Sequence, residues 1–280
     1  MSLVAFIVHE GRGPAVSTTE DMRGALGTEG IETRVVRGPE EVRDTRPDLV
    51  VSVGGDGTFL RAGRVAAEAG CPVLGVKVGR LGFLTEVEPG STALELVHAA
   101  LDGRARVDER LAVVAEPVDG TRFDPEWGLN EIMVEKGARH RLVRLAVQVD
   151  DTYVTTFSAD GVVVATPTGS TAYSFSARGP IVSPRVPSLV LTPIAAHMLF
   201  DRSFVLAADQ VVMLEVVGDE PGLLSADGRE GIELAVGSRI RIRAASQPAR
   251  LVLRDDGPSF LERVRDKFEL PGDPDVGGPD

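Results

Sequence analysis

The apolar positions divide the chain into an alternating first third and a β-rich remainder. Four segments in the first third predict strands, at residues 3–8, 31–36, 49–53 and 72–78, and the first is a continuous apolar run of the kind buried on both faces of a parallel sheet. Stretches with helical spacing separate these runs, and their cap signals predict helices from Ser17 to Gly30, from about Thr58 to Gly70 and from Ser91 to Gly103. This alternation predicts an open parallel sheet whose ligands lie beyond the strand C-termini.

Helical periodicity stops near residue 104, and short β-rich runs separated by turn signals follow as far as residue 253. We expect strands at 111–115, 132–134, 142–149, 162–165, 188–191, 211–217, 239–244 and 250–253. In Arg239-Ile240-Arg241-Ile242-Arg243 the strict alternation places the apolar residues on one face. These runs predict a second, mostly antiparallel β domain.

The domain boundaries follow from these changes of pattern. We expect an α/β domain over residues 1–104 and a β domain over 105–254. The apolar residues of 255–270 recur with helical spacing at Phe260, Leu261, Val264 and Phe268, which predicts a helix packed on the first domain. The Pro-, Gly- and Asp-rich tail, 271–280, is expected to be disordered.

Composition and charge narrow the classes of partner. The chain of 280 residues has a net charge of −12 and 43% hydrophobic residues, and Cys71 is its single cysteine. The negative charge argues against nucleic acid or an anionic membrane as the main partner, and one cysteine allows no internal disulfide. The sequence lacks a basic leader and an apolar run of bilayer length, so we expect a soluble cytoplasmic protein.

The first domain contains a glycine turn with a carboxylate inside it, Gly54-Gly55-Asp56-Gly57-Thr58, between a strand and a helix. Glycines let backbone N–H groups approach an anion, and a helix start adds the positive end of its dipole, so the turn suits a phosphate. Asp56 would repel phosphate unless it holds a metal or handles a proton, which favours phosphoryl transfer. Alternatively, Asp56 hydrogen-bonds its own turn and the glycines serve geometry alone.

The β domain carries two further polar stretches. Asn130-Glu131 precedes an apolar run, where an amide and a carboxylate can bind a sugar diol or simply form a turn. Residues 160–174 run from Asp160-Gly161 through a buried strand into Thr166-Pro167-Thr168-Gly169-Ser170-Thr171-Ala172-Tyr173-Ser174. A helix beginning near Ser170 needs one capping hydroxyl, and the surplus hydroxyls suggest a polar ligand at its start.

Together with Gly79-Arg80-Leu81-Gly82-Phe83-Leu84, these motifs resemble, in order, those of the NAD kinases. The Gly-Gly-Asp-Gly-Thr motif alone is shared with lipid kinases and phosphofructokinases, whereas the Thr-Pro-Thr-Gly-Ser-Thr-Ala-Tyr stretch is specific to NAD kinases. The resemblance implies an N-terminal open parallel α/β domain similar to phosphofructokinase, a C-terminal β-sandwich and a C-terminal helix returning to the first domain. It also implies transfer of the terminal phosphoryl group of ATP or polyphosphate, with Mg²⁺, to the adenosine 2′-hydroxyl of NAD.

The resemblance assigns roles residue by residue. Asp56 would be the catalytic base or would orient the 2′-hydroxyl, and Gly54, Gly55 and Thr58 would form the phosphate turn. The remaining residues implied to bind substrate are Gly57, Arg61, Asn130, Glu131, Arg141, Asp160, Thr171, Ala172, Tyr173, Ser174, Phe175, Ser176, Ala195, Asp227 and Arg229. NAD kinases are commonly homodimers or homotetramers. No protein-held metal site is implied, since Mg²⁺ would be carried by the donor phosphates.

Several positions depart from the family pattern, at Lys77, Ser158, Arg178, Ala195-Ala196 and Arg229. These departures could alter donor or substrate preference, yet they leave Asp56 and the nucleotide-binding motifs in place. Two alternatives therefore stay open: a lipid or sugar kinase that uses the same glycine turn, and a catalytically weak dinucleotide-binding regulator. The choice between ATP and polyphosphate, the acceptance of NADH and feedback by NADP(H) are left open by the sequence.

Overall fold

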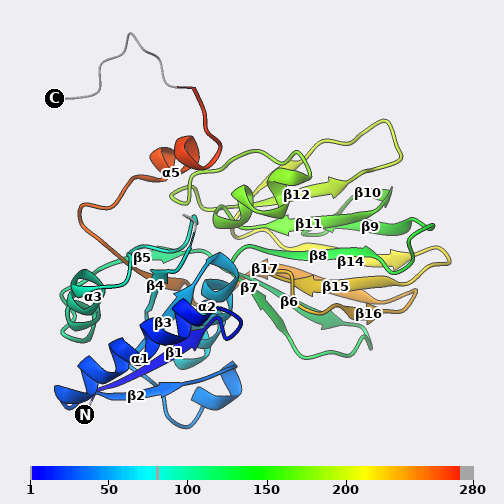
Figure 1. The fold of residues 1–280 in the computed structure, drawn as a ribbon. Coiled ribbons are helices and arrows are strands. Elements are labelled where there is room, and N and C mark those ends of the chain that lie inside the picture. Colours follow the sequence, from blue (N-terminus) through cyan, green and yellow to red (C-terminus); the bar gives the residue numbers. More distant parts are fainter. Residues whose placement is uncertain (1, 80–81, 272–280) are drawn as a thin grey trace. The chain divides into compact units, whose positions relative to one another are not determined.

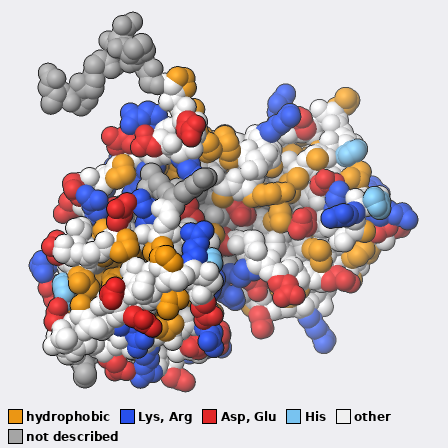
Figure 2. Space-filling model, in the orientation of Figure 1, with side chains coloured by type: hydrophobic (Ala, Val, Ile, Leu, Met, Phe, Trp, Pro, Cys, Tyr) orange, Lys and Arg blue, Asp and Glu red, His pale blue; other side chains and the backbone are white. Residues whose placement is uncertain are grey.

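The computed structural model describes residues 2–79 and 82–271, and the chain forms two compact units (Figure 1). The first unit comprises Met1–Asp108 and Arg250–Asp280, and the second comprises Glu109–Ala249. The first unit is therefore built from the two ends of the chain, with the second unit inserted between them. The arginine and lysine side chains are interspersed with aspartate and glutamate on the face shown in Figure 2.

The first unit contains a six-stranded sheet in the order β2-β1-β3-β4-β18-β5. Its strands are β1 (Leu3–Val8), β2 (Glu32–Val35), β3 (Leu49–Gly54), β4 (Val73–Lys77), β5 (Arg106–Arg110) and β18 (Ala249–Leu253). The neighbours from β2 to β18 pair in parallel. The helices are α1 (Gly13–Thr28), the 3₁₀ helix η1 (Pro39–Val42), α2 (Asp56–Ala69), α3 (Ser91–Leu101) and α5 (Phe260–Lys267). The predicted open parallel α/β arrangement is confirmed.

Burial explains why the central strands carry continuous apolar runs. Strands β1 and β3 lie inside the sheet and are buried almost throughout, with Phe6, Leu49 and Val51 fully inaccessible. Helices cover the sheet, so side chains on both faces of these strands leave water. None of the helices in the described part of the chain is long and apolar enough to cross a membrane.

Two helix starts differ from the expected ones. Helix α1 begins at Gly13 with Pro14 in its first turn, and Ser17 lies inside the helix and donates its hydroxyl to the Pro14 carbonyl. Proline is favoured at the first helical positions because its missing N–H would have no partner there. Similarly, Ser91 is the first residue of α3 and does not cap it. The positive φ of Gly70 ends α2 as predicted.

The second unit contains two six-stranded sheets, ordered β10-β9-β14-β17-β6-β7 and β13-β12-β11-β8-β15-β16. The strands of the first of these sheets are β6 (Val113–Val118), β7 (Glu126–Gly128), β9 (Val143–Val149), β10 (Thr152–Ala159), β14 (Val212–Val217) and β17 (Arg239–Ala244). Those of the second are β8 (Glu131–Lys136), β11 (Gly161–Ala165), β12 (Ser188–Ile194), β13 (Phe204–Ala207), β15 (Gly222–Ala226) and β16 (Ile232–Leu234). Neighbouring strands in both sheets pair antiparallel.

One hydrophobic core joins the inner faces of these two sheets, and the predicted β-sandwich is thereby confirmed. Val147 and Ile242 come from one sheet, and Val134 and Val164 come from the other. Strand β17 follows the predicted alternation. Its isoleucines are buried, while Arg241 and Arg243 pair with Glu116.

The last strand was assigned to the wrong sheet. Residues 250–253 were expected in the β domain, whereas β18 pairs in parallel with β4 through Leu251 and Val73. A five-residue apolar run carries no information on the sheet that it joins, because pairing depends on contacts distant in sequence. Strand β10 was missed because hydroxyl-bearing residues occupy most of its length.

Helix α5 returns to the first unit, as the fold class predicted. Ser259 and Glu262 form a capping box, and the ring of Phe268, just beyond the helix, lies 5.9 Å from that of Phe83. The apolar stripe is only partly buried, because Val264 is buried while Leu261 is exposed. Arg263 is buried beside Val264, for reasons given below. The predicted disordered tail lies outside the described residues from position 272 onward.

Candidate active site

Asp56 occupies the first position of a helix directly after a buried strand. Strand β3 ends at Gly54, Gly55 is the N-cap with extended backbone, and α2 begins at Asp56. The N–H groups of Thr58 and Phe59 both donate to the Gly55 carbonyl, 3.0 Å away, and so close the first turn. The first N–H groups of a helix have no partner within it, and its dipole favours an anion there. The sequence prediction of a strand, turn and helix around this acid is confirmed by the geometry of the element.

The three glycines of this turn serve two purposes. Gly54, Gly55 and Gly57 are absent from the glycines with positive φ. A Cβ on Gly54 would lie 2.5 Å from the Thr58 hydroxyl, whereas Cβ atoms on Gly55 and Gly57 would meet open space. Gly54 is therefore needed for close packing of the strand end against α2. Gly55 and Gly57 leave the backbone uncovered, which is the property that a phosphate requires.

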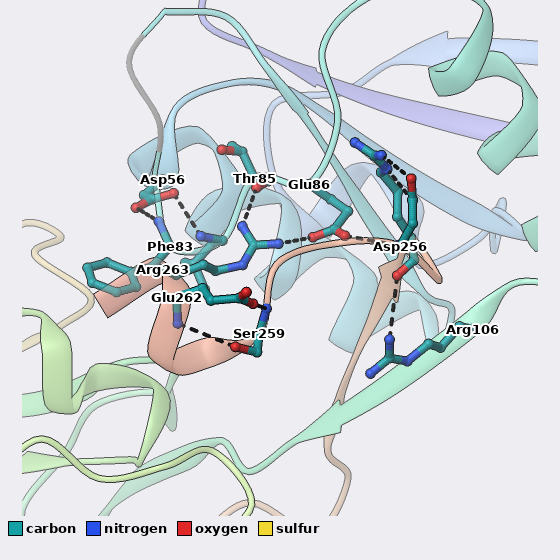
Figure 3. Close-up of polar contacts among 11 residues, drawn as sticks. Asp56, Phe83, Thr85, Glu86, Arg106, Asp256, Ser259, Glu262 and Arg263 are labelled. Atoms are coloured by element: carbon teal, nitrogen blue, oxygen red, sulfur yellow. Dashed lines mark hydrogen bonds and ion pairs between the residues drawn. The ribbon is translucent and has the colours of Figure 1, made fainter. Parts of the chain in front are cut away.

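The second glycine turn holds the Asp56 carboxylate (Figure 3). The N–H of Phe83 donates to Oδ2 at 2.8 Å, and the N–H of Leu84 donates to Oδ1 at 3.1 Å. A Cβ on Gly82 would lie 2.0 Å from Oδ1, so only glycine fits there. Two other residues of this motif, Arg80 and Leu81, lie outside the described residues. The acid is thus oriented by two backbone donors and keeps further lone pairs for another group, since a carboxylate offers about four.

In the second unit, Asp227 organises the start of β8. Its Oδ2 accepts from Leu129 N–H at 2.8 Å, and its Oδ1 accepts from Asn130 and Glu131 N–H at 2.8 and 3.2 Å. Asp227 has a φ of 50°, a left-handed conformation that aspartate tolerates better than most residues. Three consecutive backbone donors are satisfied by one side chain, which fixes the Asn130-Glu131 pair that the sequence singled out.

Glu131 is buried in an environment that disfavours its charge. Burial, and then the nearby Asp227 charge, raise the pKa of Glu131 to about 8, while a hydrogen bond from the Tyr173 backbone opposes the shift. Its Oε2 atom is buried and has no hydrogen-bond partner among the described residues. Burial also raises the pKa of Asp227, against its three N–H bonds and the charge of Arg229. The Glu131 carboxyl is therefore protonated at neutral pH and can donate a hydrogen bond.

The hydroxyl-rich turn holds the backbone at Leu129 and Asn130. Thr166 N–H donates to the Asn130 carbonyl at 2.8 Å, and Thr166 Oγ1 donates to the Leu129 carbonyl at 2.6 Å. A Cβ on Gly169 would lie 2.1 Å from the Asn130 carbonyl oxygen. Ser170 is buried, and its hydroxyl donates to the Pro167 carbonyl at 2.7 Å and accepts from the Val182 N–H at 2.9 Å. These hydroxyls satisfy backbone groups of the fold, so their number is not the evidence for a ligand that the sequence suggested.

The expected helix near Ser170 is two short pieces, the 3₁₀ helix η2 (Thr168–Thr171) and the single turn α4 (Tyr173–Ser176). The side chains of Tyr173 and Phe175 are exposed, whereas Ser174 is buried and shares a hydrogen bond of 3.2 Å with Thr192. Two aromatic rings are thus accessible beside the segment whose backbone contacts Glu131.

Of the remaining candidate residues, three are held in ion pairs and the others are accessible to solvent. Asp160 pairs with Lys136 at 2.5 Å, Arg141 with Glu220 at 3.4 Å, and Arg229 with Glu126. The other candidates are exposed or half-buried: Arg61 on α2, Thr171 and Ala172 around η2, Ser176 on α4, and Ala195 in the loop after β12. Their binding roles stay predictions.

The structure shows the contacts or the backbone conformation of four of the residues that depart from the family pattern. Lys77 pairs with Glu88 at 2.8 Å, and the Ser158 carbonyl accepts the His197 N–H. Arg178 has a φ of 69°, a left-handed conformation that glycine adopts more readily than arginine. The charge of Arg229 is paired with Glu126 within the second unit.

The sequence analysis did not identify the residues that form ion pairs with the candidate site residues or with each other near the site. Lys136 and Glu126 carried no motif, and a pattern of alternation cannot show which charged residue faces Asp160 or Arg229. Glu86 and Arg263 form an ion pair across 177 residues, so no local signal could have joined them.

Comparisons with known proteins identify the family of this chain. Residues 9–105 match the sequence model of the ATP-NAD kinase N-terminal domain, and residues 129–253 match that of the C-terminal domain. NAD kinase 2 of Streptomyces avermitilis is 38% identical, covering 96% of this chain and 94% of the relative. The NAD kinase of Heliobacterium modesticaldum is 43% identical over 82% of each chain.

Solved structures extend the comparison to the fold. An NAD kinase from Archaeoglobus fulgidus in complex with ATP is 27% identical with a TM-score of 0.74, covering 96% of this chain and 97% of the other. A yeast NADH kinase complexed with NADH, 24% identical, has a TM-score of 0.83, covers 96% and 87% of the two chains, and supports the fold alone. Two domain models that match most of the length, and relatives close to 40% identity, show that this chain belongs to the NAD kinase family and is an enzyme of that family.

Proposed function

We propose that the protein transfers the terminal phosphoryl group of ATP to the 2′-hydroxyl of the adenosine ribose of NAD, giving NADP. The observation that carries this proposal is the Asp56 carboxylate at the start of α2, fixed by the N–H groups of Phe83 and Leu84. An acid oriented in a glycine turn beside unpaired helix N–H groups combines a proton acceptor with a phosphate cradle.

In the proposed reaction, a free lone pair of Asp56 accepts the hydrogen bond of the ribose 2′-hydroxyl. As the oxygen attacks the terminal phosphorus, its proton passes to the carboxylate, the new O–P bond forms, and the bond from phosphorus to ADP breaks. A Cβ on Gly55 or Gly57 would meet open space, so no side chain keeps the donor phosphates away from the backbone N–H groups of this turn. Phosphoryl transfer depends mainly on such positioning and charge neutralisation, to which the base adds roughly 10²–10⁴-fold.

Mg²⁺ fits this arrangement as a companion of the donor. It is commonly bound through one or two carboxylates and substrate phosphates, and Asp56 offers lone pairs that its two N–H donors leave available. When bound, Mg²⁺ would neutralise charge on the donor phosphates. The structural neighbour solved in complex with ATP supports ATP as donor here, and polyphosphate is the alternative.

We assign recognition of the dinucleotide to the second unit. Asn130 and protonated Glu131 present an amide and a carboxyl donor at the entrance of β8, held by Asp227. The exposed rings of Tyr173 and Phe175 offer apolar faces to the adenine. The membership of the family supports a cytoplasmic homodimer or homotetramer as the working form.

The decisive experiment is to incubate the purified protein with NAD, ATP and Mg²⁺ and to measure NADP. We expect NADP to form, and Asp56→Asn to lower turnover roughly 10²–10⁴-fold while NAD still binds. Parallel assays with polyphosphate and NADH define the donor and the acceptor. Tight NAD binding without product would instead favour a regulator, and phosphorylation of diacylglycerol but not NAD would favour a lipid kinase.

A further inference from the structure

The segment that holds Asp56 is itself fastened to the C-terminal helix (Figure 3). Arg263 of α5 donates from Nη1 to the Thr85 carbonyl at 3.1 Å and from Nη2 to Glu86 Oε2 at 2.5 Å. The side chains of Arg263 and Glu86 are only 10% and 3% exposed. A buried guanidinium that bonds both a carbonyl and a carboxylate is geometrically specific. Residues 85 and 86 follow directly after the two N–H donors to Asp56.

Two further contacts join the same segments. Glu86 Oε1 accepts the Arg254 N–H at 2.9 Å, so one carboxylate ties α5 to the chain that leads into it. The rings of Phe83 and Phe268 lie 5.9 Å apart in a tilted arrangement. The C-terminal segment therefore contacts the ring of Phe83, the carbonyl of Thr85 and the carboxylate of Glu86.

The opposite side of the segment leaves little room for displacement. Glu86 and Val87 N–H groups both donate to the Gly75 carbonyl of β4, at 2.8 and 3.2 Å. A Cβ on Gly75 would lie 2.9 Å from the Leu84 carbonyl oxygen, and a Cβ on Gly257 would lie 2.5 Å from Glu86 Oε1. The segment is thus held between β4 on one side and the C-terminal residues on the other.

We propose that Arg263, acting through Thr85 and Glu86, is a positioning residue for the Asp56 carboxylate. This proposal rests on the catalytic role of Asp56 given above. Arg263 fixes the backbone of residues 83–86, and that backbone directs the two N–H groups that set the orientation of the acid. The C-terminal helix then supports the catalytic acid of the first unit through the backbone of residues 83–86.

A merely structural ion pair would predict a different pattern of effects. If Arg263 only stabilised the fold, its loss would lower the melting temperature and leave kcat unchanged well below that temperature. If it positions Asp56, its loss also lowers kcat while the KM for NAD stays the same, because NAD recognition is assigned to the second unit. A displacement of about 1 Å in catalytic geometry can cost up to about 100-fold in rate.

The test compares Arg263→Met with Arg265→Met, a matched substitution two residues along the same helix. Arg265 is exposed and pairs only with its neighbour Asp266 in the described interactions. We expect Arg263→Met to lower kcat about tenfold with KM for NAD changed less than twofold, and Arg263→Lys to recover part of the loss. Arg265→Met should match the wild type in both parameters.

Amide hydrogen exchange gives a readout that does not depend on activity. We expect the N–H groups of Phe83 and Leu84 to exchange at least several-fold faster in Arg263→Met than in the wild type or Arg265→Met. Since removing one partner of a buried pair can prevent folding, Arg263→Met/Glu86→Met replaces both partners with apolar side chains and serves as the second variant.

Unchanged kcat and unchanged exchange in a folded variant would overturn the positioning role. If instead the wild type makes no NADP, the proposed function fails, and the exchange experiment alone still decides whether Arg263 controls the N–H groups that hold Asp56.

Discussion

Each unit contains an Asp-Gly pair whose carboxylate accepts backbone N–H groups from another segment, and the two acids are used differently. Asp56 begins a helix, is half-buried and accepts two N–H groups, from Phe83 and Leu84. Asp227 lies in a turn with positive φ and accepts three, from the consecutive residues 129–131. The same dipeptide therefore occurs in one place with spare lone pairs and in the other with most of its capacity filled.

The contrast shows that surroundings, rather than residue type, separate an acid that can react from an acid that builds structure. Asp56 keeps acceptor capacity at the positive end of a helix dipole, where an incoming hydroxyl can use it. The carboxylate oxygens of Asp227 accept the N–H groups that orient Asn130 and Glu131, and burial disfavours the Asp227 charge. Removing the first should affect the rate, and removing the second should affect folding and NAD binding.

The largest expected effect is that of Asp56→Asn on turnover. The amide can accept one of the two N–H bonds but cannot take up a proton, so kcat should fall roughly 10²–10⁴-fold. The melting temperature should change by only a few degrees, and the dissociation constant for NAD, measured by calorimetry, should stay within about twofold. Retention of full turnover by this variant would remove the distinction between the two acids.

The second prediction moves Asp56 without changing it. In Gly82→Ala the new Cβ would lie 2.0 Å from Asp56 Oδ1, so the carboxylate must shift, and we expect kcat to fall about 100-fold. Gly24→Ala is the control, because Gly24 lies exposed in α1 and its Cβ would meet open space. The control should keep the wild-type kcat and melt slightly higher, since alanine favours a helix. Equal rates in the two variants would show that the orientation of Asp56 is unimportant.

Features whose contacts lie close together along the chain could be predicted from the sequence, and features whose contacts are far apart along the chain could not. The strand, turn and helix around Asp56 are consecutive, so glycine spacing and apolar periodicity located them. The pairing of β18 with β4 joins Leu251 to Val73, and a short apolar run cannot identify a partner so distant. The same limit placed residues 250–253 in the wrong domain.

The candidate site shows the limit again at the level of side chains. The motifs located Asp56 and Asn130-Glu131, but not the reason for their orientation, which lies in Phe83, Leu84 and Asp227. The surplus of hydroxyls over residues 166–174 was interpreted as a sign of a polar ligand, whereas Thr166 and Ser170 bond the backbone. A sequence shows that hydroxyls are abundant, and only the fold shows which groups they satisfy.

The third prediction removes the structural acid. Asp227→Ala leaves three N–H groups of residues 129–131 without their acceptor, so the free energy of unfolding should fall by about 2–4 kcal/mol, and NAD should bind more weakly. Trp127, the single tryptophan, lies beside this cluster and reports urea unfolding of the second unit by fluorescence. Asp150→Ala is the control, since Asp150 also has positive φ and accepts the Val211 N–H, but in an exposed turn. Equal losses would refute the special role of Asp227.

The smallest expected effect concerns pH and Glu131. Its pKa is raised from 4.5 to about 8 by burial and by Asp227, so between these values the folded state holds a proton that the unfolded state has released. Stability therefore falls as pH rises from about 4.5 to about 8. Glu131→Gln cannot ionise, and its stability relative to the wild type should rise by roughly 1–3 kcal/mol between pH 5 and pH 8. Urea unfolding at several pH values measures the difference.

The same experiment in an Asp227→Ala background tests whether the two acids of this unit are coupled. Without the Asp227 charge, the pKa of Glu131 should lie closer to its ordinary value, because that charge is the second cause of the shift. Glu131→Gln should then change the pH dependence less than it does in the wild type, while burial preserves part of the effect. Glu135→Gln, on the same strand, controls for substitution of a glutamate in β8. An identical pH dependence in both backgrounds would mean that burial alone keeps Glu131 protonated, and Asp227 would then orient the backbone at Asn130 without tuning the carboxyl beside it.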